Sequence, residues 1–164
     1  MKVFFYLVRM KYTRLTKEQL EELHQEFINF LATQSITGEE WKQIKEKQPE
    51  AAEQELDIFS DLIWDGVLSK ANYLQNRSSQ QFFLFKLVKK EMQLIVVKVT
   101  EATVDLMTPK GFEWLQNNIS SDSVELFTAS KAYSEERNKD VFELIRQGAE
   151  IVTGKMYDAF QKFI

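Results

Sequence analysis

The sequence predicts an α+β fold with N-terminal helices, a small antiparallel sheet built on a central hairpin, and further C-terminal helices. Two patterns predict it. Before residue 76, apolar residues recur at intervals of three and four, which is typical of amphipathic helices. Between residues 82 and 99, two runs rich in β-branched and aromatic residues indicate paired strands.

Three helices are predicted before the sheet. Thr16 opens a capping box with Gln19, and an amphipathic helix is expected over about residues 17–33. Thr37 opens a second capping box for a shorter helix. Pro49 suits the first turn of a third and longest helix, over about residues 49–75, because the N–H that proline lacks is not needed there.

The predicted hairpin joins residues 82–88 to residues 92–99 through a short turn at 89–91. Residues 124–128 are predicted to add a third strand. Because both runs of the hairpin are almost continuously apolar, we expect both faces of the sheet to be largely covered, with helices on one or both sides.

Further helices are predicted towards the C-terminus. Thr108 starts a short one, and Ser134 precedes the last main helix, which is expected to end at Gly148. Residues 149–164 fit either a small hairpin or a helical continuation. We interpret residues 10–164 as a single α+β domain, and residues 1–9 as either a non-native extension or an added strand.

Charge is distributed unevenly along the chain, whose net charge is −4. Residues 17–65 carry 13 Asp and Glu against 4 Lys and Arg, whereas residues 1–16 carry four basic residues and no acidic one. An acidic surface repels phosphate backbones, so this pattern favours protein partners over nucleic acid. The alternative is that these acids only solvate helix faces.

Composition also indicates the compartment. The chain has no cysteine, which excludes disulfides and thiolate metal sites and fits a reducing environment. No apolar run is long enough to cross a bilayer. We therefore expect a soluble, cytoplasmic protein with no membrane partner.

One lysine of the predicted third helix falls within its apolar stripe. At 100° per residue, Lys70 lies close to Ile63 in phase, with Tyr73 and Arg77 on the same side. A lysine at such a position snorkels, pairs with an acid, or faces a cleft. The functional interpretation is a pocket for a small anion or small molecule at Lys70, Tyr73 and Arg77. The structural one is that cations suit a helix C-terminus.

Three carboxylates of the same helix are spaced four residues apart. Asp57, Asp61 and Asp65 form a ladder on the side opposite the apolar stripe. Such a ladder is either a weak candidate site for a hard cation or, more commonly, a solvated face. No cofactor-binding motif accompanies it, and we expect no cofactor.

The predicted hairpin combines basic and aromatic residues. Lys86, Lys89, Lys90 and Lys98 stand beside several phenylalanines. Aromatic sheets with basic rims can stack nucleic-acid bases, although phenylalanine at this density usually belongs to a core.

Several short stretches resemble a known family. They are residues 10–20, 59–64, 67–70, 73–74 with Arg77, 111–115, 125–128, and 148–149 with 154–155. Together they are similar to a family of short bacterial proteins known only as a domain of unknown function, over about residues 10–160. The resemblance implies a start at Met10, and it implies no activity, cofactor or catalytic residue.

The sequence therefore predicts a non-catalytic interaction or adaptor protein that acts through an acidic helical surface. The alternative is a small-molecule or anion-binding protein, with or without enzymatic activity, whose pocket lies at Lys70, Tyr73 and Arg77. A third hypothesis is weak nucleic-acid binding through the hairpin. The oligomeric state is left open.

Overall fold

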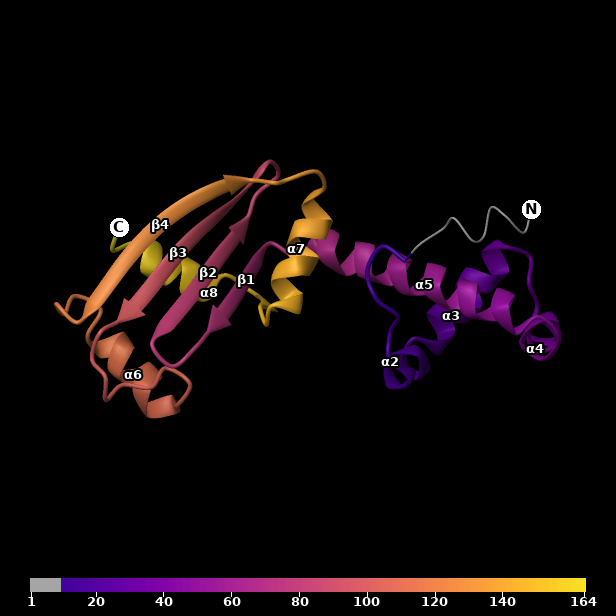
Figure 1. Ribbon diagram of the computed structural model, residues 1–164, viewed down its shortest axis with the longest axis horizontal. Helices are drawn as coiled ribbons and strands as arrows, with labels where there is room; N and C mark the ends of the chain where they lie inside the picture. The colour runs from indigo at the N-terminus through magenta and orange to yellow at the C-terminus, as the bar shows by residue number, and fades with distance from the viewer. Residues whose placement is uncertain (1–9) are drawn as a thin grey trace. The chain divides into compact units, whose positions relative to one another are not determined.

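The computed structural model describes residues 10–164, and the predictions made for residues 1–9 lie outside the described residues. The chain forms two compact units, the first ending at Val67 and the second running from Leu68 to Ile164. Figure 1 shows helices in the first unit and a sheet with helices in the second, so the fold is α+β as predicted. Whether the units fold as the single predicted domain stays a prediction.

Between residue 10 and the end of the first unit, four helices are described, of which the last continues into the second unit: α2 (Lys17–Glu22), α3 (His24–Thr33), α4 (Gly38–Lys47) and α5 (Pro49–Lys70). Both predicted capping boxes form, at Thr16 and at Thr37. The single helix predicted over residues 17–33 is wrong in one respect, because Leu23 leaves the helical conformation (φ −95°, ψ 23°) and separates α2 from α3.

The core of the first unit is small and largely aromatic. Its buried members are Leu15, Phe27, Leu31 and Phe59. The Phe27 ring meets the Phe59 ring edge-on, with 5.1 Å between centroids, and meets Trp41 in the same way at 5.1 Å. Aromatic pairs in this geometry add attraction beyond the burial of their surface.

The third predicted helix is shorter than expected. It ends at Lys70, and residues Tyr73–Arg77 form strand β1 instead of its last turns. Leu74 satisfies both patterns, because it falls on the helical stripe in phase and is also a buried strand residue paired with Phe85. Strand pairing outweighs local helical periodicity here, as tertiary contacts commonly do.

The second unit contains a five-stranded antiparallel sheet. Its strands are β1, β2 (Gln81–Leu87), β3 (Glu91–Val99), β4 (Val124–Ala132) and β5 (Glu150–Val152), in the order β4-β3-β2-β1-β5. The predicted hairpin is confirmed as β2 and β3. The predicted third strand is present as β4 and is longer than expected. The open question about the C-terminal tail is resolved as β5 followed by helix α8 (Lys155–Gln161).

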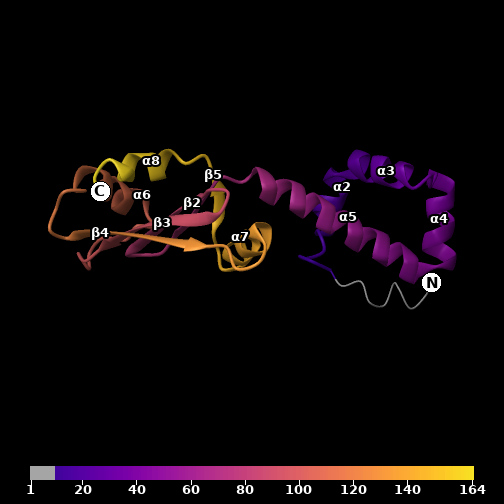
Figure 2. The same ribbon diagram turned by 90° about the horizontal axis from the view of Figure 1, so that it is seen from above.

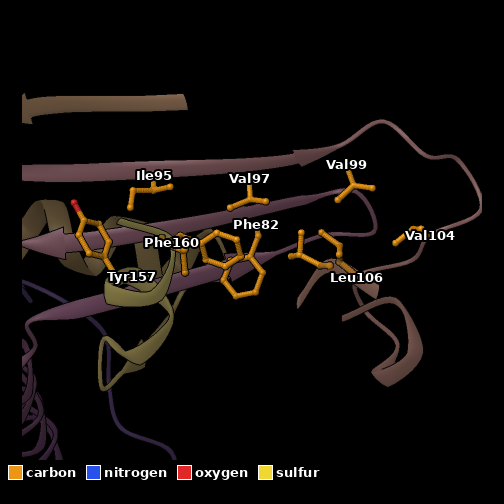
Figure 3. Close-up of a cluster of buried hydrophobic side chains, with 10 residues drawn as sticks. Phe82, Ile95, Val97, Val99, Val104, Leu106, Tyr157 and Phe160 are labelled. Carbon is orange, nitrogen blue, oxygen red and sulfur yellow. The ribbon is translucent and has the colours of Figure 1, made fainter. Parts of the chain in front are cut away.

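One face of the sheet, here called the first face, carries the main core. Figure 2 shows α8 and α6 (Pro109–Asn117) on the same side of the sheet. Figure 3 shows the side chains gathered there, among them Phe82, Ile95 and Val97 from the strands and Phe160 from α8. All four are at most 1% exposed. This face is covered as predicted.

The opposite, second face is covered less completely than predicted. Helix α7 (Arg137–Arg146) buries Val141 and Phe142, and at its end the side-chain amide of Asn76 donates to the carbonyl of Gln147 (3.4 Å). Farther across the sheet, Phe127 is 51% exposed. The sequence pattern of near-continuous apolarity does not distinguish a fully covered face from a partly covered one.

Among residues 10–164, no helix is long and apolar enough to cross a bilayer.

Candidate functional site

The basic segment that precedes the helices binds the acidic ladder of α5. Residues 10–16, here called the arm, present their backbone to Asp61, whose carboxylate accepts the N–H groups of Lys11 (2.7 Å) and Tyr12 (3.0 Å). The Tyr12 hydroxyl donates to Asp65, and the Lys11 ammonium lies 3.5 Å from the same carboxylate. Asp61 therefore binds backbone N–H groups of the arm, and Asp65 binds side chains of the arm.

The rest of the arm continues the same pattern. The Arg14 guanidinium binds the Asp57 carboxylate (Nε–Oδ1, 2.6 Å) and the Glu53 carboxylate (Nη1–Oε2, 2.7 Å). At the end of the arm, the N–H of Leu15 donates to the hydroxyl of Ser60 (3.1 Å). Ser60 is fully buried, and its hydroxyl donates a hydrogen bond to the Leu56 carbonyl (2.7 Å), so this polar group is satisfied inside the core.

These contacts alter the acid–base properties of the arm. Burial, and then the hydrogen bond and negative charge of Asp65, raise the pKa of the Tyr12 phenol well above its usual value. The hydrogen bond to Asp57 raises the pKa of the Arg14 guanidinium. Tyr12 therefore stays a neutral donor, and Arg14 stays a cation, throughout the physiological range.

The carboxylates of the ladder are therefore bound by the arm, a segment of the same unit. Asp57, Asp61 and Asp65 are each engaged by the arm, and residues 10–164 contain no group of three or more side chains placed to hold a metal ion. Lys11 and Arg14 bring positive charge to the carboxylates at which the sequence suggested a hard cation, and metal binding there stays a prediction. The spacing of four residues was visible in the sequence, but its pairing with a segment about fifty residues earlier was not.

We expect Asp61→Ala to release the arm. Two backbone N–H groups lose their acceptor, so the free energy of unfolding should fall by about 1–3 kcal/mol. Urea denaturation measures this, and hydrogen exchange of the Lys11 and Tyr12 amides should accelerate in parallel. Glu46→Ala, at an exposed position of α4, is the matched control and should change stability by about 0.5 kcal/mol or less. Equal losses in both variants would contradict the assigned role of Asp61.

Helix α2 and the first turn of α3 carry four further acidic side chains. Glu18, Glu21, Glu22 and Glu26 are exposed, and the structure shows no ion pair from any of them to residues 10–164. We call these four residues the acidic surface. Helix α4 differs, because Lys42, Lys45 and Lys47 offset Glu39, Glu40 and Glu46 along its length.

The structure separates the three residues of the predicted anion pocket. Lys70 is exposed at the last position of α5, whereas Tyr73 and Arg77 lie in β1. The premise that the three share one helix face is therefore wrong. Their role in binding is a separate matter and stays a prediction.

Each of the two β1 residues has aromatic neighbours on the first face. The Tyr73 ring packs on Tyr157 (5.9 Å between centroids). The Arg77 guanidinium lies over the rings of Phe82 and Phe112, at 5.6 and 5.2 Å from their centroids. Cation–π contacts of this kind hold an arginine against a core without an acidic partner.

A shallow hollow of about 480 Å³ lies near the end of α5. It is lined by Ser69, Asn72, Leu87, Lys89, Glu136, Arg137 and Asn138. Arg137 donates to the carbonyls of Leu68 (2.8 Å) and Ala71 (2.5 Å), so it satisfies carbonyl groups that a helix leaves unpaired at its C-terminus. Sequence reasoning missed this cap, because Arg137 lies 66 residues after Ala71.

The basic residues of the hairpin do not converge on one face. Lys86 shares the first face with Leu84, whereas Lys98 shares the second face with Val96. Lys89 and Lys90 are exposed at the turn. Nucleic-acid binding stays a prediction, and this arrangement lends it no basic rim around a single aromatic face.

Comparison with known proteins identifies the family of the chain. A model described as "Family of unknown function (DUF6495)" matches residues 10–164, and the chain belongs to this family. The match supports the resemblance seen in the sequence motifs. No curated protein and no solved structure matches the chain.

Proposed function

We propose that this member of the DUF6495 family is a non-catalytic interaction module of the bacterial cytoplasm, which binds a basic protein partner through the acidic surface. One observation carries the proposal. The arm binds the acidic ladder of α5. In contrast, the four glutamates of the acidic surface form no ion pair with a lysine or arginine among residues 10–164.

The contrast within one unit supports this choice of surface. Helix α4 is close to neutral, and the three aspartates of the α5 ladder are bound by the arm, through Lys11, Tyr12 and Arg14. Lys17 is the one lysine or arginine of α2 and α3, and the four glutamates of the acidic surface are exposed to solvent.

A surface of this kind has a defined effect on binding. Clustered charge of one sign raises the rate of encounter with an oppositely charged partner and repels like-charged ones. The attraction weakens as salt shortens the Debye length, to about 8 Å at physiological ionic strength. A basic protein surface meets these conditions, and a phosphate backbone does not.

The compartment is part of the proposal. The chain has no cysteine, which fits a reducing environment. The bacterial origin follows the family resemblance of the sequence motifs.

Affinity capture with matched variants tests the proposal. The triple substitution Glu21→Gln, Glu22→Gln and Glu26→Gln removes three charges from the acidic surface. The control, Glu39→Gln, Glu46→Gln and Glu50→Gln, removes three charges from exposed positions elsewhere in the same unit. We expect wild type and control to retain the same basic protein at low salt and to release it at high salt, and the first variant to lose it. A partner that all three retain equally, or no partner with wild type, would overturn the proposal.

A further inference from the structure

Strand β4 forms an open edge of the sheet. It is the outermost strand beside β3, as Figure 1 shows, and seven of its nine residues are exposed. An edge strand presents a row of N–H and C=O groups to whatever extended chain can pair with it. Proteins commonly protect such an edge by covering it, shortening it or placing charges along it.

The hydrogen bonds between β3 and β4 determine which backbone groups of β4 point outwards. The N–H of Thr100 donates to the carbonyl of Ser123 (2.8 Å), and the register continues with Val99 opposite Val124. Hydrogen-bonded pairs alternate in an antiparallel ladder, so the odd-numbered residues of β4 bond to β3. The even-numbered residues Leu126, Thr128 and Ser130 point their backbone groups outwards, and the structure shows no hydrogen bond from these groups to residues 10–164.

The charges of β4 are placed symmetrically about its centre. Glu125 lies three residues before Thr128, and Lys131 lies three residues after it. Both side chains are exposed, and both lie on the second face together with Phe127 and Ala129. An antiparallel strand of identical sequence, centred on Thr128, therefore sets each Glu125 opposite a Lys131 of the other chain.

We infer that β4 pairs antiparallel with β4 of a second copy of this chain, with the two-fold axis at Thr128. The outward N–H and C=O groups of Leu126, Thr128 and Ser130 pair with those of the second chain, with roughly six hydrogen bonds between the chains. The two Thr128 residues face each other, Phe127 lies opposite Ala129, and the sheet continues across the dimer. Such a contact uses the same patch on both subunits and closes on itself.

The charges also select the register. A shift that centres the pair on Phe127 sets Glu125 opposite Ala129, and a shift to Ala129 sets Lys131 opposite Phe127. Only the register centred on Thr128 joins two opposite-charge pairs, and opposite charges directly across a strand pair stabilise it. This inference is independent of the acidic surface, which lies in the other unit.

Sedimentation equilibrium on the full chain tests the pairing. We expect wild type to have twice the 19.3 kDa mass of one chain. Thr128→Pro removes an outward N–H and leaves the bonds to β3 in place, so it should give a folded monomer. Thr128→Val keeps the N–H and should stay dimeric. A wild type that is monomeric, or a dimer that Thr128→Pro leaves intact, overturns the inference.

Charge reversal tests the register. Glu125→Lys alone sets like charges opposite each other in the homodimer, as does Lys131→Glu alone, so each variant should be monomeric. An equimolar mixture of the two restores both opposite-charge pairs and should form a dimer, as should the double variant. A dimer that persists in either single variant, or a mixture that stays monomeric, contradicts the register and with it the inference.

Discussion

Replacing Phe59 with alanine should destabilise the first unit by about 3–5 kcal/mol, the usual loss when a fully buried phenylalanine is truncated. Phe59 is 1% exposed, and its ring contacts those of Phe27 and Phe30 at centroid distances of 5.1 and 5.4 Å. The substitution leaves a cavity in a small core, whose other buried apolar members among the described residues are Leu15, Phe27 and Leu31. Since domains are typically stable by about 5–15 kcal/mol, the loss takes a large share of the total.

Urea denaturation followed by circular dichroism measures this loss. The matched control is Leu62→Ala, three residues farther along α5, where the side chain is 57% exposed. Its effect should stay within about 0.5 kcal/mol. If both substitutions cost the same, α5 does not bury the face that the structure assigns to it.

Gly111→Ala should destabilise the second unit by about 3 kcal/mol or more, although alanine is the better helix former. A Cβ atom at Gly111 would lie 1.8 Å from the carbonyl oxygen of Asp105. That oxygen cannot move aside easily, because it accepts hydrogen bonds from the N–H (3.1 Å) and the hydroxyl (2.7 Å) of Thr108. The clash therefore displaces the turn before α6. This turn contains Leu106, whose side chain is fully buried.

Gly66→Ala is the matched control for this effect. Gly66 lies inside α5, and a Cβ atom there would meet nothing within 4 Å. The same substitution should therefore stabilise the protein by about 0.5–1 kcal/mol, through the lower backbone entropy of alanine in the unfolded chain. Thermal or urea unfolding compares the two variants. A neutral Gly111→Ala would show that α6 does not approach the turn as closely as described.

The parts of the fold that depend on neighbouring residues could be predicted from the sequence. Both capping boxes, Pro49 at the start of α5 and the hairpin of β2 and β3 all follow from local patterns. The sequence did not show where α5 ends. Leu74 continues the helical stripe, and only its pairing with Phe85 in β2 makes it a strand residue.

The candidate site was predicted in part. The acidic character of residues 17–65 was evident, but the division of those acids was not. Asp61 looked like a member of an open ladder, and it is the acceptor for two backbone amides of the arm. A pairing between segments fifty residues apart leaves no periodicity in the sequence. The basic residues of the arm, Lys11 and Arg14, were the available signal, since their charge is opposite to that of the ladder.

The two units carry different surfaces. The first unit presents the acidic surface of α2 and α3, and the second presents the open edge of β4. A two-fold pairing at β4 would place two copies of the acidic surface in one particle. Two linked sites bind a multivalent basic partner more tightly than one, because the second contact is intramolecular.

A titration of the isotopically labelled protein with a lysine-rich peptide locates the binding surface, through the amide chemical shifts in NMR spectra. We predict that shifts begin at residues 18–26 and disappear when salt is added, because the arm already occupies the carboxylates of the ladder. The amides near Asp57, Asp61 and Asp65 should stay unchanged. Shifts that begin at the ladder, or that spread evenly over both units, would contradict the claim that the acidic surface is the binding surface.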